Sequence, residues 1–179
     1  MASPIIKYVD WNVNETKCSL MKGSRVGNAA ISNSVTKQII ELETPSFVTK
    51  YSVDDKYGPK IKIHSDEVNF DKFLEFEQFV NDMEKSTLLL TENKKKSIYC
   101  PMISEDCAFI NFSIYLEELD KLEVVDKDNI IQLYKDVESL KLLLPKKSKI
   151  VCFIKFQYLY NNHGKYGVKK IITKIKKLQ

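Results

Sequence analysis

Apolar and polar residues alternate along two stretches near the C-terminus, Lys149 to Tyr160 and Tyr166 to Leu178. Alternation with a period of two is typical of a β-strand, because successive side chains point to opposite faces. Between them lies the polar sequence Asn-Asn-His-Gly-Lys, and a short break that contains glycine favours a hairpin. We therefore predict that residues 146–179 form an antiparallel β-hairpin.

Further strands are predicted earlier in the chain. Small and turn-forming residues dominate Gly23 to Ser34 and Asp54 to Pro59, so we expect loops there. Thr44-Pro45 should end a strand, because proline lacks an amide hydrogen and restricts the residue before it. The expected strands are Ile5 to Val9, Thr36 to Glu43, Phe47 to Val53, Lys60 to His64 and Asp106 to Leu116.

Two stretches show a helical period instead. Apolar residues recur at helical spacing between Asp66 and Glu84, and again between Lys127 and Leu140. The phenylalanines of the first stretch are expected to pack in the core, because buried aromatic rings contribute large apolar areas. The fold class that follows is β-rich α+β, a small barrel-like plan with inserted helices. We expect one domain over residues 1–179, in which residues 1–34 supply an N-terminal strand and loop.

The bulk composition indicates an ordinary soluble protein. Its 179 residues suffice to bury a core, and 44% of them are hydrophobic. No apolar run is long enough to span a bilayer, and the N-terminal sequence lacks the pattern of a secretion signal. We therefore expect an intracellular protein with no membrane partner. The four cysteines have no C-x-x-C spacing and are expected to be reduced thiols, without a metal or other cofactor; they are Cys18, Cys100, Cys107 and Cys152.

Charge is distributed unevenly along the chain. The net charge is only +4, yet every charged side chain after Ser139 is a lysine. Arg25 is the one arginine. Lysine binds phosphate as a point charge, whereas arginine is the usual reader of base edges. A basic hairpin with interleaved aromatic residues therefore favours single-stranded nucleic acid, held by its backbone and by stacking rather than by sequence readout.

Motifs of the common enzyme classes are missing. The sequence contains no G-x-x-x-x-G-K-[ST], G-x-G-x-x-G, G-x-S-x-G or H-E-x-x-H. The carboxylate pairs Asp54-Asp55 and Glu117-Glu118 are adjacent in sequence, and adjacent strand residues point to opposite faces. We therefore do not expect an enzyme.

Three pieces of the chain carry a family resemblance: T-K-Q-I-I-E-L-E-T-P-S-F-V, D-K-Y-G-P-K-I-K-I, and the C-terminal segment from L-L-P-K-K-S-K-I-V to I-T-K-I-K-K-L. In these the chain resembles the single-stranded DNA-binding proteins of nucleocytoplasmic large DNA viruses. Cytoplasmic linear DNA plasmids of yeasts carry similar replication genes and are an equally admissible source of this sequence. The resemblance covers residues 35–85 and 105–179. An extra histidine in N-N-H-G-K-Y-G and a weak match over residues 1–34 depart from the family pattern.

The resemblance implies an oligonucleotide/oligosaccharide-binding (OB) β-barrel that coats DNA during replication, in the host cytoplasm or a viral factory. Its partners would be single-stranded DNA, further copies of itself or replication proteins, and RNA stays open as a ligand. Two rival functions stay open as well: a structural or adaptor protein of a virion or replication complex, and an RNA-binding accessory factor.

The candidate nucleic-acid-binding residues come from the hairpin and the strands before it. If alternation is unbroken, Cys152, Ile154, Phe156, Tyr158 and Tyr160 form the interior set, which leaves Tyr158 open between core and stacking. The proposed phosphate track consists of Lys50, Lys60, Lys62, Lys155, Lys165, Lys169, Lys170 and Lys174. The proposed stacking residues are Tyr51, Tyr57, Tyr158, Tyr160 and Tyr166.

Overall fold

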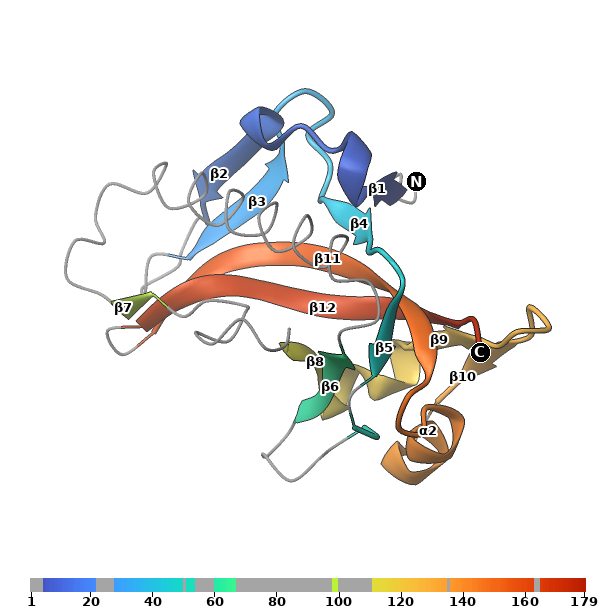
Figure 1. The fold of residues 1–179 in the computed structure, drawn as a ribbon. Coiled ribbons are helices and arrows are strands. Elements are labelled where there is room, and N and C mark those ends of the chain that lie inside the picture. The colour runs from blue at the N-terminus through green and yellow to red at the C-terminus, as the bar shows by residue number, and fades with distance from the viewer. Residues whose placement is uncertain are drawn as a thin grey trace.

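A computed structural model of the chain describes a mostly β structure with one α-helix among the described residues (Figure 1). These residues are 5–21, 28–49, 51–53, 60–66, 98–99, 111–134, 136–162 and 165–179. The β-rich α+β class predicted from the sequence is therefore confirmed. Within the described residues, no helix is long and apolar enough to cross a membrane.

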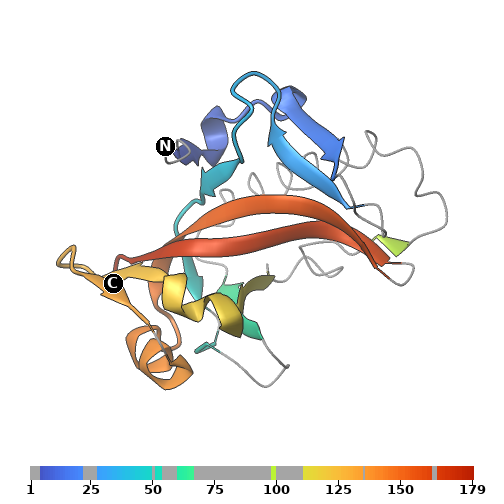
Figure 2. The same cartoon turned by 180° about the vertical axis from the view of Figure 1, so that it is seen from behind.

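A long antiparallel hairpin runs through the middle of the molecule. It consists of β11 (Lys149–Asn162) and β12 (Lys165–Lys177). Its register runs from the pair Ile150 and Lys177 to the pair Asn162 and Lys165. In Figures 1 and 2, β2, β3 and β4 lie on one side of this hairpin and β5, β6 and β8 on the other. The predicted C-terminal hairpin is confirmed.

The edge of β11 that faces away from β12 pairs with three strands in turn: β3 (Ala29–Asn33), β4 (Glu41–Glu43) and β5 (Phe47–Thr49). β3 pairs onward with β2 (Thr16–Leu20), and β4 pairs in parallel with β1 (Ile5–Lys7). Short 3-10 helices at Tyr8–Asp10 and Val13–Glu15 connect β1 to β2.

The break between β4 and β5 falls at Thr44-Pro45, as predicted. The Thr44 amide donates to the Cys152 carbonyl at 2.9 Å, and the Cys152 amide donates to Thr44 Oγ1 at 3.0 Å. These two bonds satisfy the backbone of β11 where no regular ladder is formed. The predicted strands Thr36 to Glu43 and Phe47 to Val53 are shortened to β4 and β5.

The outer edge of β12 is occupied near both ends. It pairs in parallel with β7 (Ile98–Tyr99) near the hairpin turn and with β9 (Glu123–Val125) near the C-terminus. β9 pairs with β10 (Ile131–Leu133). On the other side β5 pairs with β6 (Lys60–Asp66), and β6 pairs with β8 (Asn111–Tyr115), which precedes a 3-10 helix at Leu116–Lys121.

The sheet curls back on itself. Following the pairing from β12 through β11, β5 and β6 leads to β8, which lies beside β12. No ladder joins β8 to β12 among the described residues, so the sheet is not closed there.

Each strand of the hairpin contains one extra residue. Gln157 is inserted in β11 between the pairs Phe156–Lys170 and Tyr158–Lys169, and Thr173 is inserted in β12 between Ile154–Ile172 and Phe153–Lys174. A bulge of this kind breaks strict alternation and bends the strand. The fully buried residues of β11 are accordingly Ile150, Cys152, Ile154, Phe156 and Leu159.

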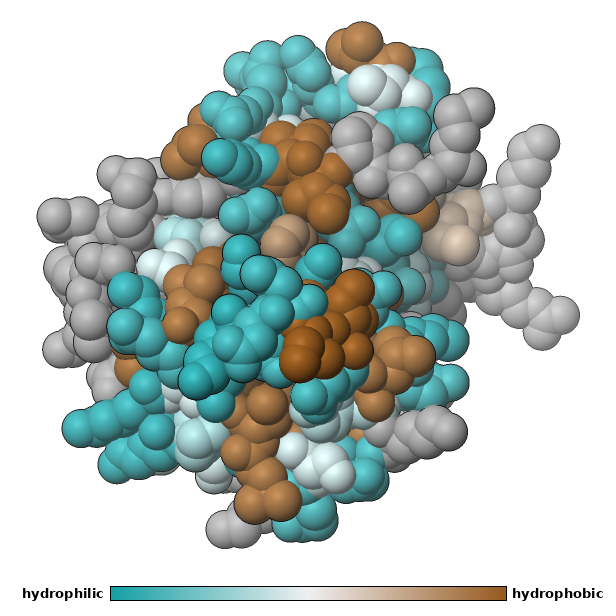
Figure 3. Space-filling model, turned by 90° about the vertical axis from the view of Figure 1, so that its right-hand side faces the viewer, coloured by the Kyte–Doolittle hydropathy of each residue, from teal (hydrophilic) through white to brown (hydrophobic). Residues whose placement is uncertain are grey.

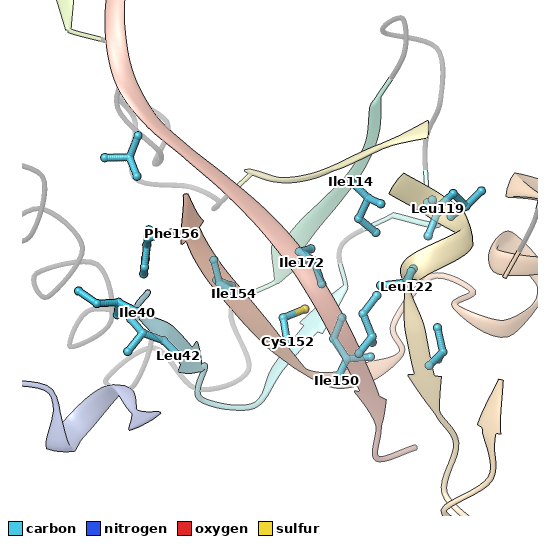
Figure 4. Packing of buried hydrophobic residues seen from close by; sticks show 14 of the residues in the cluster. Ile40, Leu42, Ile114, Leu119, Leu122, Ile150, Cys152, Ile154, Phe156 and Ile172 are labelled. Carbon is cyan, nitrogen blue, oxygen red and sulfur yellow. The ribbon is translucent and has the colours of Figure 1, made fainter. Parts of the chain in front are cut away.

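The buried residues of β11 form the centre of the core. Figure 4 shows Cys152 and Ile150 near Ile172 and Leu122, with Ile40 and Leu42 on the side of Phe156. Trp11 stacks on Phe156 with ring centroids 6.3 Å apart. Because β3, β4, β9 and both hairpin strands contribute to this cluster, its burial fixes the register of all of them.

The predicted helix from Lys127 to Leu140 is wrong in its first half. Asp126 Oδ1 accepts hydrogen bonds from the amides of Asp128 and Ile130, and Asn129 has φ 60°. This turn folds the chain back onto β9, so that β10 forms where a helix was expected. The helix α2 (Val137–Leu143) begins only after Asp136, whose side chain accepts from the Ser139 amide. That bond lowers the pKa of the Asp136 carboxyl.

Other predictions differ from the structure in smaller ways. The predicted loop Gly23 to Ser34 contains β3, and neither β2 nor β9 was predicted. The first strand stops at Lys7 instead of Val9, whereas Lys60 to His64 is confirmed within β6. The Asp106 to Leu116 strand is confirmed over β8, but it ends at Tyr115 because Leu116 begins the 3-10 helix. The predicted helix from Asp66 to Glu84 and the Asp54 to Pro59 loop lie outside the described residues, except Asp66, which ends β6.

Apolar side chains are exposed on the side of the molecule where β10 and α2 lie. Figure 3 views the molecule from this side and shows brown hydrophobic groups among teal hydrophilic ones. Leu133 is 64% exposed and Leu142 is 83% exposed, and Ile130 and Ile131 are also exposed. β10 has only three residues, and shortness limits the tendency of an edge strand to pair with other chains.

The burial of Cys152 generates the first prediction. Burial raises the pKa of the Cys152 thiol and blocks access to it, whereas Cys18 is only half-buried. Alkylation with iodoacetamide at pH 8, read by peptide mass spectrometry, should label Cys18 and leave Cys152 unlabelled, because the thiolate is the reacting form. Unfolding in urea should make Cys152 reactive. Labelling of Cys152 as fast as Cys18 in the native protein would contradict this core.

Candidate nucleic-acid interface

The hairpin presents a second face, opposite the core, which we call the outer face. Register and the two bulges define its members, since cross-strand partners project on the same side of a sheet. On β11 the outer face consists of Val151, Phe153, Lys155, Tyr158 and Tyr160. On β12 it consists of Lys165, Gly167, Lys169, Ile171, Lys174 and Lys176.

Two lysines of β12 lie over aromatic rings of β11. Lys169 Nζ is 5.6 Å from the centroid of the Tyr158 ring, and Lys174 Nζ is 5.5 Å from that of Phe153. Such cation–π contacts are worth about 0.5–1 kcal/mol at exposed sites. Tyr158 and Lys169 are both half-buried, so that a ring and an ammonium group are presented together at the surface.

The outer face next to the hairpin turn has little bulk on β12. Tyr160 pairs with Gly167, which has no side chain, and Tyr160 is half-buried. Lys165 is exposed at the first position of β12. We call Tyr158, Tyr160, Lys165, Gly167 and Lys169 the distal half of the outer face.

The other half of the outer face mixes both signs of charge. Lys155 pairs with Glu41, Phe153 pairs with Glu43, and Lys174 pairs with Glu123. Thr173 Oγ1 donates to Glu41 Oε1 at 2.5 Å. Because Glu41 is on β4 and Thr173 on β12, this carboxylate reaches across β11. We call Phe153, Lys155, Lys174 and Lys176 the proximal half.

On the side of β11 away from β12, the distal half is followed by β3 and then β2, which contribute small residues. Tyr158 pairs with Ala30 on β3, and Ala30 pairs with Ser19 on β2. In the next row Ser32 pairs with Lys17, and both Lys17 and Ser19 are exposed. None of these residues of β2 and β3 was among the candidates predicted from the sequence. The period-two spacing of Ala29, Ile31 and Asn33 in N-A-A-I-S-N, three residues that the structure buries, was the signal that could have revealed β3.

The structure brings six of the candidate residues together on the outer face: Lys155, Tyr158, Tyr160, Lys165, Lys169 and Lys174. The alternation prediction holds as far as Phe156 and is wrong beyond it, because the extra residue Gln157 turns Tyr158 and Tyr160 away from the core and puts Leu159 inside. Lys170 pairs with Phe156 and lies on the opposite face from Lys169.

The other candidates are not brought to this surface by the described residues. Tyr51 is 50% exposed but follows β5, which pairs with the opposite end of β11. Lys60 and Lys62 belong to β6, which β5 separates from β11. Only the backbone of Tyr166 is placed, opposite Asn161. Lys50 and Tyr57 lie outside the described residues.

No metal site is apparent in the part of the chain that the structure describes, since it contains no group of three potential His, Cys, Asp or Glu ligands. The chemistry available on the distal half, with the adjoining residues of β3 and β2, is that of ammonium groups, phenol rings and small hydroxyl or methyl side chains. Such a surface attracts phosphates and offers rings on which bases can stack.

The sequence matches no protein-family model and no curated protein sequence. Its structure is similar to that of the single-stranded DNA-binding protein from bacteriophage Enc34, with a TM-score of 0.53 and 10% identity over 91% of this chain and 90% of that one. The same phage protein in complex with single-stranded DNA gives a TM-score of 0.50 and 9% identity, over 90% of this chain and 94% of that one. At this identity the comparison shows a shared fold.

Alanine substitutions of two adjacent residues of β11, Tyr158 and Leu159, test the bulge at Gln157. Leu159→Ala should lower the free energy of unfolding by about 2–5 kcal/mol, because Leu159 is 0% exposed. Tyr158→Ala should lower it by only about 1 kcal/mol or less, because that side chain is half-buried on the outer face. Urea unfolding followed by circular dichroism measures both values. A loss for Tyr158→Ala as large as that for Leu159→Ala would place Tyr158 in the core.

Proposed function

We propose that this protein binds single-stranded DNA on its outer face, with the phosphates near the lysines and the bases on Tyr158 and Tyr160. One observation carries the proposal: the cross-strand pair in which Lys169 Nζ lies 5.6 Å from the Tyr158 ring centroid. One nucleotide of a flexible single strand can stack its base on the Tyr158 ring and place its phosphate near the Lys169 ammonium group. A duplex keeps its bases stacked inside and cannot offer them to Tyr158.

The fold supports the same ligand. Two solved structures that share this fold are of a protein named for binding single-stranded DNA, and one of them contains it. We propose further that β5, β6, β8, β11 and β12 correspond to an OB-type barrel, a plan in which oligonucleotides bind across one face. The proximity of β8 to β12 supports this correspondence.

The proposed role is non-enzymatic coating of DNA during replication, with little sequence preference. Lysine is the cation of the outer face, and the chain has one arginine in all, so backbone contacts should dominate over base-edge readout. The family resemblance of the sequence makes a large DNA virus or a similar cytoplasmic DNA element the proposed source, and the cytoplasm the proposed location. Further copies of the chain and replication proteins are the partners that such coating would involve.

One observation favours a second function, that of an adaptor protein. The exposed apolar side chains of β10 and α2, with Leu142 at 83% exposure, are suited to a protein contact. An adaptor would need no affinity for oligonucleotides. Recovery of protein partners after nuclease treatment, by a protein that does not bind oligonucleotides, would favour this function over the first.

Salt-resolved titration tests the proposed function. Fluorescence anisotropy should show that single-stranded DNA binds more tightly than duplex DNA of the same length. With about five phosphate contacts, the log–log slope of affinity against salt should be about −3.5. Equal or tighter duplex binding, or affinity independent of salt, would contradict the proposal. RNA of the same length is the third ligand, because tighter RNA binding would require a contact to the 2′-hydroxyl.

Substitutions separate the contributions that Tyr158 and Lys169 make to DNA binding. Tyr158→Ala should weaken binding by about 1–3 kcal/mol through the loss of one stacked base, and Tyr158→Phe should retain most of the affinity. Lys169→Ala should make the salt slope shallower by about 0.7, the value of one phosphate contact on a single strand. The same anisotropy assay reads both changes. Wild-type affinity in Tyr158→Ala would exclude stacking at this position.

A further inference from the structure

We infer that the bound strand crosses the hairpin at its distal half and continues onto β2 and β3, so that Lys17 and Ser19 belong to the binding surface. The inference rests on the proposed function and specifies the path that the strand takes. The alternative is a path along the length of the hairpin, through the proximal half. Register, charge and side-chain size distinguish these two paths.

Register defines a continuous row across four strands. Lys169 on β12 pairs with Tyr158 on β11, Tyr158 pairs with Ala30 on β3, and Ala30 pairs with Ser19 on β2. Paired residues project on the same face of a sheet. With strands about 4.8 Å apart, the row is about 14 Å long. The surface next to Tyr158 therefore extends well beyond the hairpin.

The side chains that β3 and β2 contribute to this row are small. Ala30 and Ser19 are small, so nothing on β3 or β2 in this row rises beside the Tyr158 ring. Ser19 is exposed and offers a hydroxyl group that can donate to a phosphate or a base. Lys17, exposed in the neighbouring row opposite Ser32, supplies an ammonium group at the far side.

Charge opposes the alternative path. Along the hairpin, Lys155 and Lys174 have Glu41 and Glu123 as cross-strand neighbours, and Phe153 has Glu43. Thr173 holds the Glu41 carboxylate across β11. A phosphate following the proximal half would approach these carboxylates, and like charges at short range are repelled. The row from Lys169 to Ser19 contains no carboxylate.

Two lysines outside the Tyr158 row test the path by single substitution. Lys17→Ala should weaken single-stranded DNA binding about threefold or more and make the salt slope shallower by about 0.7. Lys127→Ala is the matched control, because it removes the same charge from an exposed turn outside the outer face, and its affinity should stay within about twofold of wild type. Lys174→Ala, in the proximal half, should weaken binding less than Lys17→Ala does. A larger loss for Lys174→Ala than for Lys17→Ala would place the strand along the hairpin and overturn the inference.

Charge introduced into the row gives a second test. Ser19→Glu adds a carboxylate at an exposed position and should weaken binding strongly at low salt and less at high salt. Glu43→Gln should leave affinity unchanged or raise it. Wild-type affinity in Ser19→Glu overturns the inference, and circular dichroism confirms that each variant is folded. If the wild-type protein itself fails to bind single-stranded DNA, the proposed function fails with it, a result distinct from a misplaced path.

Discussion

One strand, β11, contributes residues to the core on one face and to the candidate binding surface on the other. The bulge at Gln157 determines which residues of β11 point to which face. Without an extra residue, Tyr158 would follow Phe156 into the interior. With it, Leu159 takes the buried place and Tyr158 projects outward to meet Lys169. The outward position of both tyrosines therefore depends on a local irregularity that the packing of Phe156 and Leu159 holds in place.

The strands that pair with the two hairpin strands divide the outer face into two chemical regions. β4 and β9 bring Glu41, Glu43 and Glu123 next to the proximal lysines, whereas β3 brings only Ala30 next to Tyr158. The net charge of +4 conceals this division. Lysines that are indistinguishable in the sequence thus have different surroundings, and a count of basic residues overstates the surface available to a polyanion.

Much of the fold could be predicted from local pattern. The hairpin of β11 and β12 has long alternating stretches and a glycine-containing turn, and Pro45 marks the break after β4. The helix predicted across Lys127 to Leu140 failed because Asp126 and Asn129 form a turn that helical spacing does not reveal. β2 and β9 are short and gain their stability from pairing with distant strands, which local pattern cannot show.

The candidate site was predictable in composition but not in geometry. Tyrosines interleaved with lysines identified the hairpin, yet strict alternation assigned Tyr158 and Tyr160 to the wrong face. The residues around Gln157 are aromatic or aliphatic on both faces, so the bulge cannot be recognised from the pattern. Lys170 was grouped with Lys169 although neighbours in a strand point to opposite sides. The contribution of β2 and β3 depends on a long-range pairing between Tyr158 and Ala30, which no stretch of sequence contains.

Photo-crosslinking to single-stranded DNA tests the central claim most directly. An oligonucleotide that carries 5-iododeoxyuridine, irradiated in complex with the protein and digested for mass spectrometry, reports which side chains contact the bases. Crosslinks at Tyr158 or Tyr160 are the predicted result, since an iodinated base reacts with an aromatic ring that it stacks on. Crosslinks confined to peptides of β9, β10 and α2, with none in β11, would contradict the account.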